Sequence, residues 1–378
     1  MFWLIPDERD GRLTTSFRLQ LHRLLILDKT MPIQYLIRII VCVCLLSSQV
    51  AQSAQITKSS RFTVIDHYNI GGEGGWDLLT FDAKHHRLFI SRSTHVQVID
   101  AVSGKVVGDI PDTEGVHEIA LADDLNIGFT SNGKSNSVTV FDLSTLTVIG
   151  SIKISGLNPD AILYEPQSRH IFTFNGHSAN ATVIDAITLK EINTIALPGK
   201  PELAVSDKTG KVFVNIEDKN EIVVIDGASN KLLKHFPIGS GVEPTGLAID
   251  QEHNRLFSVC ANHKMEILDS KTGNIVSEVD IGAKPDSAAF DPSLGIAFSS
   301  NGDGTLTIVK ENDPDHFSVL QNVITQKGAR TMAYDSGNHR AYLVTASFGE
   351  TLPATAEQPK PRPAIIPNSF VVLVVSLQ

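Results

Sequence analysis

The chain has little cysteine, few aromatic residues and no long apolar run in its main body. Only three of its 378 residues are cysteines, and two of these, Cys42 and Cys44, lie near the start. Cys260 is therefore alone in the rest of the sequence, which excludes an internal disulfide there. The absence of CxxC and CxxCH motifs also argues against a zinc knuckle and covalent haem. Aromatic residues make up 6% of the chain and glycine occurs 27 times, a balance typical of many short strands joined by tight turns.

Positive charge is scarce as well. The formal net charge is −10. Without the first 54 residues, which carry six basic and four acidic side chains, the chain has 26 basic and 38 acidic ones. An acidic body repels a phosphate backbone, so we do not expect a nucleic acid as partner.

The start of the chain has the order of a secretory signal peptide. Arg38 precedes an apolar run, and small polar residues follow as far as Gln55. The run is too short to span a membrane, which needs about 20 apolar residues. We predict an over-extended gene start over residues 1–30 and a signal peptide over residues 31–54. The product is expected to be periplasmic or secreted, with no membrane span after the signal is removed.

One pattern recurs along residues 61–378 with a period of about 40 residues. Each copy has an apolar strand ending near an acidic residue, a polar turn, a strand centred on an aromatic residue, and a third strand that usually ends in Asp. The aromatic positions are Phe89, Phe129, Phe172, Phe213, Phe257, Phe298 and Tyr342. A fourth strand closes each unit, and such small sheets bury their faces by stacking in a ring. The sequence therefore predicts an all-β, seven-bladed β-propeller with four antiparallel strands per blade.

The last copy reaches only a third strand, in SFVVLVVSLQ, whereas the segment 61–70 ahead of the first copy reads as an unpaired strand. We predict that this N-terminal strand joins the last blade and closes the ring. Within that blade, residues 349–369 form a loop insertion with five prolines, which favours an extended, semi-rigid conformation. The insertion is either a lid or partner arm, or an excursion without a binding role.

Several segments resemble the YVTN-type propeller repeat. VFVN at 212–215 is close to the tetrapeptide of that repeat, and GVEPTGLAIDQEHNRLFSV and GTLTIV read in the same way. Over about residues 61–378 the chain is similar to the YncE-like family of exported bacterial proteins. This resemblance implies the fold and little chemistry, because the family shares a repeat rather than a reaction. Nucleic-acid binding has been proposed within the family, but it would need a basic face.

Most of the repeated polar residues have a structural explanation. An Asp at the start of a turn accepts a hydrogen bond from the backbone about two residues later. We give this role to the Asp residues that end the first and third strands, such as Asp250 and Asp269.

The predicted binding site is one mouth of the central channel, where the links between blades meet the turns between second and third strands. The residues at or beside the starts of the first strands are Trp76, Asp77, His117, Asp160, Glu202, Thr245, Asp286 and Arg330. The turns between second and third strands add Arg92, Asn132, Asn175 and Asn301, although Asn-Gly is also a common turn sequence. Convergent carboxylates with a cation nearby could hold a metal, a cationic ligand or a water for hydrolysis.

Three histidines of the same turns, His95, His177 and His263, fall in alternate blades. Three imidazoles on one face could bind a transition metal if their turns point inward. We predict no cofactor, with a divalent metal as the alternative.

The sequence favours a monomeric, non-enzymatic binding or interaction module with a small-molecule or protein partner. It contains no metalloprotease helix motif and no nucleotide-binding fingerprint. The alternative is a propeller enzyme, either a metal-dependent hydrolase or lyase or a protein similar to quinoprotein dehydrogenases. Such an enzyme would use the Asp, His and Arg side chains of the channel mouth as acid, base and oxyanion groups.

Overall fold

The computed structural model describes residues 61–351, 353 and 363–378, so the predicted start segment and signal peptide, residues 1–54, lie outside the described residues. Within the described part the chain forms 28 β-strands and one short 3-10 helix, η1 (Glu217–Lys219). No helix in this part is long and apolar enough to cross a membrane.

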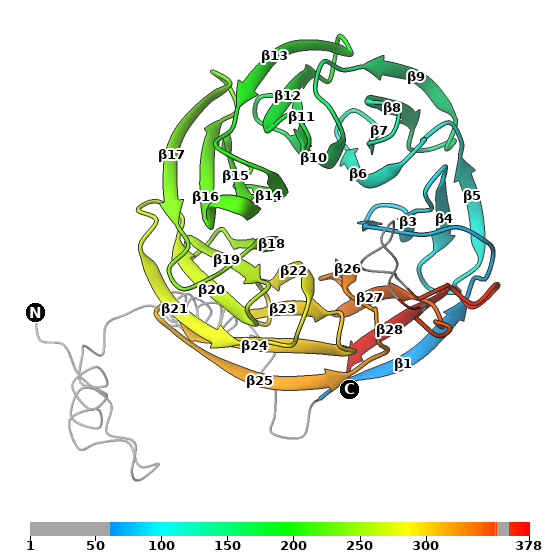
Figure 1. Ribbon diagram of the computed structural model, residues 1–378, viewed down its shortest axis with the longest axis vertical. Coiled ribbons are helices and arrows are strands. Elements are labelled where there is room, and N and C mark those ends of the chain that lie inside the picture. Colours follow the sequence, from blue (N-terminus) through cyan, green and yellow to red (C-terminus); the bar gives the residue numbers. More distant parts are fainter. Residues whose placement is uncertain (1–60, 352, 354–362) are drawn as a thin grey trace, which may run out of the picture. The chain divides into compact units, whose positions relative to one another are not determined.

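The strands form seven sheets of four antiparallel strands, which are arranged as blades around one axis (Figure 1). The innermost strands are β2 (Leu79–Asp82), β6 (Val116–Ala122), β10 (Pro159–Glu165), β14 (Pro201–Ser206), β18 (Pro244–Asp250), β22 (Pro285–Asp291) and β26 (Thr331–Asp335). The second strands are β3 (Arg87–Ser91), β7 (Ile127–Asn132), β11 (His170–Asn175), β15 (Lys211–Ile216), β19 (Arg255–Cys260), β23 (Ile296–Asn301) and β27 (Arg340–Thr345). The third strands are β4 (Val96–Asp100), β8 (Ser137–Asp142), β12 (Asn180–Asp185), β16 (Glu221–Asp226), β20 (Lys264–Asp269), β24 (Thr305–Asp313) and β28 (Val371–Leu377). The outermost strands are β5 (Val106–Ile110), β9 (Val148–Lys153), β13 (Lys190–Ala196), β17 (Lys231–Pro237), β21 (Ile275–Asp280), β25 (His316–Ile324) and β1 (Phe62–Asn69). The predicted fold is confirmed.

The N-terminal strand closes the ring as predicted. Strand β1 pairs with β28 along its length, from Phe62 opposite Leu377 to Asn69 opposite Val371. The Phe62 ring is 1% exposed and lies edge-on to Phe298 of the neighbouring blade, with ring centroids 5.4 Å apart. Blade 7 therefore combines the first described strand with the last three.

The core lies in layers between neighbouring blades. The seven aromatic residues of the second strands are each 0 or 1% exposed. The second strand β3 is buried at every position, whereas the outermost strand of the same blade, β5, is mostly exposed. A short, continuous apolar run is the pattern of a strand covered on both faces. The apolar content of a strand therefore indicates whether it lies inside a blade or at its outer edge.

The Asp residues that end the first and third strands hold their turns together. The Oδ1 atom of Asp269 accepts the backbone N–H groups of Lys271 and Thr272 at 3.0 and 2.8 Å. Asp250 accepts the backbone N–H of Glu252 at 2.9 Å in the same way. Burial acts to raise the pKa of Asp269, but these hydrogen bonds outweigh it and hold the pKa below its usual value.

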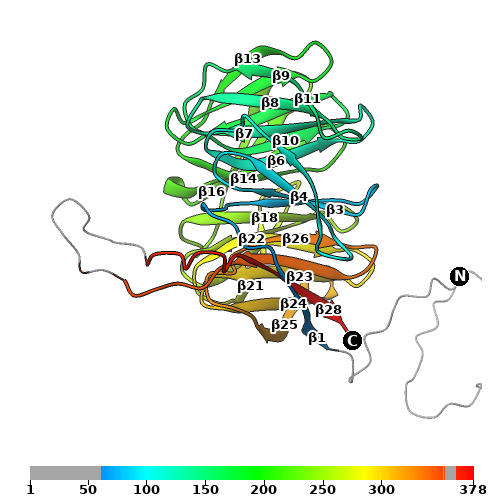
Figure 2. The ribbon, with the colours of Figure 1, turned by 90° about the vertical axis from the view of Figure 1, so that its right-hand side faces the viewer.

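The proline-rich segment leaves the ring between β27 and β28, and residues 352 and 354–362 of it lie outside the described part. Its base is a short antiparallel pairing, in which the Gly349 N–H donates to the Ala364 carbonyl at 2.8 Å and Phe348 bridges to Ile365. Figure 2 shows the described ends of the segment running out from the ring.

Candidate functional site

The starts of the innermost strands define one face of the ring, called here the first face, and their ends define the second face. The links between blades and the turns between second and third strands meet on the first face. The Gly133 N–H in such a turn donates to the Gly115 carbonyl in a link at 2.9 Å. A Cβ atom at Gly133 would come within 2.7 Å of the His117 Nε2 atom. The structure thus brings both predicted sets of segments to one face.

A β-bulge near the start of several innermost strands orients the residues of the first face. The pairing register shifts between Val116 and Ile119 in β6 and between Pro159 and Ile162 in β10. Strands β14, β18 and β22 have a shift at the same place. A bulge leaves a residue unpaired and changes the direction of its side chain. His117 lies inside one of these bulges and Asp160 inside another, which explains how side chains of different blades meet.

Three predicted residues from blades 1, 2 and 3 form a compact cluster. The His117 Nδ1 atom lies 2.6 Å from Asp77 Oδ2 and 3.3 Å from Asp160 Oδ1. The three side chains are 25 to 28% exposed. Burial acts to lower the pKa of His117, but the hydrogen bond to Asp77 and the charges of Asp160 and Asp77 outweigh it, so the pKa is raised. Burial also raises the pKa of Asp160, against the opposing charge of His117.

Three further ion pairs, two of them made by Lys200, lie near the same mouth. The Lys200 Nζ atom lies 2.6 Å from Glu202 Oε1 and also contacts the carboxylate of Glu217. Burial raises the pKa of Glu202 despite its bond to Lys200. The Arg330 Nε atom lies 3.1 Å from Asp286 Oδ2. Burial raises the pKa of Asp286 to about 7, against the charge of Arg330.

Glu118 differs from these carboxylates because it has no ion-pair partner within the described part of the chain. Its Oε2 atom accepts the backbone N–H of Ile162 at 2.8 Å. Burial raises the pKa of Glu118 to about 8, and the negative charges of Asp160 and Asp77 add to this effect. Near neutral pH its carboxyl group is therefore largely protonated and can donate a proton.

These residues together are called the ionic cluster: Asp77, His117, Glu118, Asp160, Lys200, Glu202, Glu217, Asp286 and Arg330. Its carboxyl groups outnumber its basic groups two to one, and Asp286 is influenced by the charges of Asp77 and Asp160. The ligand atoms of Asp77, His117 and Asp160 all lie within 4.8 Å of one another. Neighbouring ligand atoms of a divalent ion are about 3 Å apart for bonds near 2.1 Å. In the structure the short His117–Asp77 contact is one in which a proton is shared. The same three side chains can hold a divalent cation instead if their ligand atoms move closer together.

The three predicted Asn residues lie inside the blades instead of at the mouth. Asn132, Asn175 and Asn301 are each 0% exposed. In Asn132, Oδ1 accepts the Thr130 hydroxyl at 2.8 Å and Nδ2 donates to the Thr139 hydroxyl at 2.8 Å. The other two repeat this arrangement with hydroxyl groups of their own blades. The amides brace the second and third strands and are not available to a ligand on the axis.

Trp76 and Arg92 pack at the base of the proline-rich segment. The Trp76 ring lies 5.1 Å from the Phe370 ring, centroid to centroid. The Arg92 guanidinium lies 3.9 Å from the centroid of the same ring and donates to the Glu73 carbonyl at 2.8 Å. Thr245 is also used structurally, because its hydroxyl lies 3.2 Å from the Pro285 carbonyl in the next blade.

The three histidines of alternate blades do not meet. His95 Nε2 points toward the outermost strand, 3.5 Å from Asp109 Oδ2, and His177 and His263 are exposed. Among the described residues, no group of His, Cys, Asp and Glu with metal-binding spacing includes any of the three.

The sequence places Glu118 and Lys200 on this face only as neighbours of the predicted ligand-binding residues, and Glu217 is missing from the predicted site. Glu118 directly follows His117, and Lys200 directly precedes the innermost strand β14, so both lie one position from the aligned residue. Glu217 comes from the turn that contains η1, where Ile216-Glu217 occupies the positions of the Asn-Gly of other blades. This departure from the repeat was the sequence signal that could have indicated Glu217 as a site residue.

No family model matches the chain, and no curated protein matches its sequence. Solved structures match by fold. A chain in the structure described as "Crystal Structure of Mitotic Checkpoint Complex" aligns with a TM-score of 0.68 at 12% identity, over 85% of this chain and 94% of that one. At this identity the similarity shows a shared fold and nothing about chemistry. By structure and comparison, the chain is a seven-bladed β-propeller.

Proposed function

We propose that this protein is a binding module whose ionic cluster takes a cationic ligand, with a divalent metal ion held by Asp77, His117 and Asp160. The observation that carries the proposal is the convergence of these three ligand atoms, each from a different blade, within 4.8 Å. Two carboxylates and one imidazole suit divalent ions such as Zn²⁺ or Mn²⁺. The surplus of carboxyl groups around them attracts cations and repels a nucleic-acid backbone.

Metal binding at this place would be coupled to proton release. The raised pKa of His117 means that its imidazole is protonated at neutral pH more often than a free one, and a metal binds only the deprotonated nitrogen. We therefore expect the apparent affinity to rise with pH and ion binding to release protons, up to one from His117 for each ion.

The place where the protein acts is inferred from its sequence. Its segment 31–54 has signal-peptide order, and its repeat resembles that of the YncE-like exported proteins. We propose a monomer that acts in the periplasm or outside the cell. N-terminal peptide analysis of the mature protein would test this: the expected first residue lies near position 55, and a product that retains residues 1–30 would contradict it.

Calorimetric titration with Zn²⁺, Mn²⁺ and Ca²⁺, in two buffers with different ionisation enthalpies, tests the metal site. We expect one ion per chain, proton release, and tighter binding at pH 8 than at pH 6. Asp160→Asn should weaken binding at least tenfold, whereas Asp109→Asn, on the outermost strand β5, should leave it unchanged. Binding that is equal in both variants, or absent in the native protein, would refute the proposal.

A metal-dependent hydrolase or lyase is the second candidate, and Glu118 is the observation that favours it. A carboxyl group with a pKa of about 8, influenced by the charges of Asp160 and Asp77, is suited to act as a general acid near neutral pH. Turnover of lactone or ester probes by the metal-loaded protein would test it. Glu118→Gln should then abolish turnover while metal binding persists, and absence of turnover in the native protein would leave the binding module as the function.

A further inference from the structure

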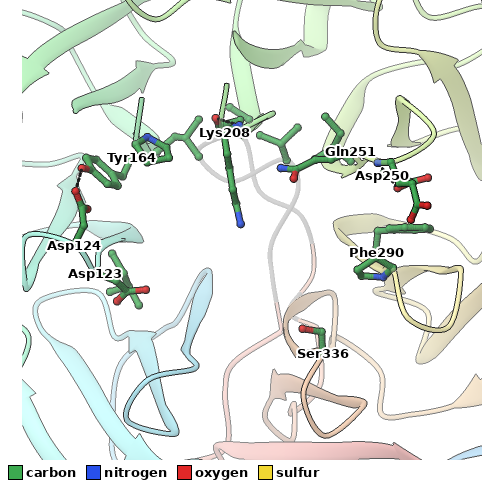
Figure 3. Close-up of a pocket in the computed structure, with 17 residues that line it drawn as sticks. Asp123, Asp124, Tyr164, Lys208, Asp250, Gln251, Phe290 and Ser336 are labelled. Atoms are coloured by element: carbon green, nitrogen blue, oxygen red, sulfur yellow. Dashed lines mark hydrogen bonds between the residues drawn. The ribbon is translucent and has the colours of Figure 1, made fainter. Parts of the chain in front are cut away.

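The second face of the ring carries a cavity of its own. It has a volume of about 950 Å³ and is lined by the ends of innermost strands and the turns after them, from blades 2 to 7 (Figure 3). No residue of the ionic cluster lines it. Along an innermost strand, the first lining residue follows the ionic cluster by two to four residues, as from Glu202 to Ala204 or from Asp286 to Phe290. At about 3.3 Å per residue this corresponds to roughly 7–13 Å. The cavity is therefore distinct from the proposed cation site.

The wall of the cavity is apolar because of one repeat position. The residue directly before the end of an innermost strand lines the cavity in five blades, as Leu121, Tyr164, Val205, Ile249 and Phe290. These side chains are half-buried, although most apolar and aromatic side chains in the blades are fully buried. The Phe290 ring stacks on Phe257, with centroids 5.0 Å apart, which fixes its position. A concave, largely apolar space of this size is typical of small-ligand sites.

The rim of the cavity has an excess of negative charge. Among the lining residues, Asp123, Asp124 and Glu252 face one basic residue, Lys208. Asp124 is also paired with Arg169, whose Nε atom lies 3.8 Å from its carboxylate. The Asp124 carboxylate accepts the Tyr164 hydroxyl at 3.1 Å. Asp123 and Glu252 are exposed, and within the described part their carboxylates have no ion-pair partner. In Figure 3 the Lys208 side chain extends into the opening.

We propose that this second-face cavity binds a small organic cation with an apolar body, such as an aryl-alkyl ammonium. The apolar body would lie against the half-buried side chains of the strand ends, where its burial is favourable. The ammonium group would remain at the rim, close to Asp123 in blade 2 or to Glu252 in blade 5, where a carboxylate attracts it without being removed from water. An anion of the same shape gains the same apolar burial but is repelled by the rim, so the cavity selects by charge.

A set of three ligands with one apolar body tests this charge selection. Calorimetric titrations at pH 7 and low salt would compare 4-phenylbutylammonium, 4-phenylbutanol and 4-phenylbutyrate. We expect a dissociation constant at least tenfold lower for the cation than for the anion, with the alcohol in between. Glu252→Gln and Asp123→Asn should each weaken cation binding about threefold, whereas Lys208→Gln should strengthen it by a similar factor. All three side chains are exposed, so these variants are expected to fold.

Variants of the first face separate this proposal from the proposed metal site. Asp160→Asn should leave ammonium binding unchanged. Equal affinity for cation and anion, failure of the cation to bind, or no response to the rim substitutions would each overturn the proposal. Loss of ammonium binding in Asp160→Asn with no effect of Glu252→Gln would also overturn it, because the ammonium would then occupy the ionic cluster.

Discussion

Replacing Asp77 with Asn should lower the pKa of His117 and make the stability change depend on pH. The substitution keeps the shape of the side chain but removes the charge that lies 2.6 Å from His117 Nδ1. A hydrogen bond between charged groups contributes about 1.5–3 kcal/mol, and one pKa unit corresponds to about 1.4 kcal/mol. Asp160 remains 3.3 Å away and compensates in part, so we expect the pKa to fall by about one unit.

The stability effect of Asp77→Asn follows from the same shift. Because the pKa of His117 in the folded protein is raised above its usual 6.5, its protonation stabilises the fold fully below about pH 6.5. That stabilisation is lost as pH rises through the folded-state value. The variant should therefore be less stable by about 1–2 kcal/mol near pH 5.5. Near pH 9 it should be equal to the native protein or more stable, since one of several crowded carboxylates is gone.

Two measurements check this prediction. An NMR titration of the imidazole Hε1 resonances between pH 5 and 9 gives the pKa of His117, and urea unfolding at both ends of the range gives the stability change. Asp109→Asn serves as the control and should leave the His117 titration unchanged. A His117 pKa that moves by less than about 0.3 units in Asp77→Asn would show that the bond does not govern protonation of the cluster.

Three further substitutions test the account by urea unfolding. Burial holds the pKa of Glu118 at about 8, so the native protein loses stability as pH rises from 4.5 toward 8. Glu118→Gln should leave the free energy of unfolding unchanged near pH 4 and increase it by about 2 kcal/mol near pH 8, allowing for partial exposure. A uniform effect at all pH values would contradict this. Phe62→Ala should cost about 3–5 kcal/mol because the ring closes the propeller core, whereas Ile65→Ala on the same strand should cost under about 0.5 kcal/mol; similar losses would argue against the ring closure. Asp291 ends β22 in blade 6, and its carboxylate is 0% exposed and accepts the hydroxyl of Tyr334 in blade 7 at 2.6 Å. Asp291→Ala should therefore cost about 3 kcal/mol or more; a loss below about 1 kcal/mol would show that this bond between the blades contributes little.

The fold could be predicted because the same pattern of strands and turns occurs in seven copies along the sequence. Each aromatic residue from Phe89 to Tyr342 keeps its place in a second strand, and a strand covered on both faces needs a continuous apolar run. The first-face cluster could be predicted in part for the same reason, since alignment of the copies brings Asp77, His117 and Asp160 to equivalent strand starts. Their mutual distances could not be predicted, because they depend on the bulges that turn the His117 and Asp160 side chains.

Other features depend on contacts that an alignment of repeats does not contain. An Asn before Gly in a turn can point to the axis or back into its blade. The Asn132 amide points into its blade because it is hydrogen-bonded to the hydroxyls of Thr130 and Thr139. These partners are apparent only when the strands are paired. The second-face cavity could not be predicted, because in the sequence Ile249 and Phe290 do not differ from the buried apolar residues of other strands. Their partial exposure arises from the separation of the innermost strands, which is a property of the whole ring.

The most direct test of the central claim is a crystal structure of the protein soaked in Mn²⁺, with an anomalous difference map collected at pH 8 and at pH 5.5. The account predicts one strong peak at pH 8 between Asp77, His117 and Asp160, and its loss at pH 5.5, where the imidazole keeps its proton. A map without a peak there at pH 8, at Mn²⁺ concentrations that saturate binding in solution, would contradict the claim that this face of the propeller binds a divalent cation.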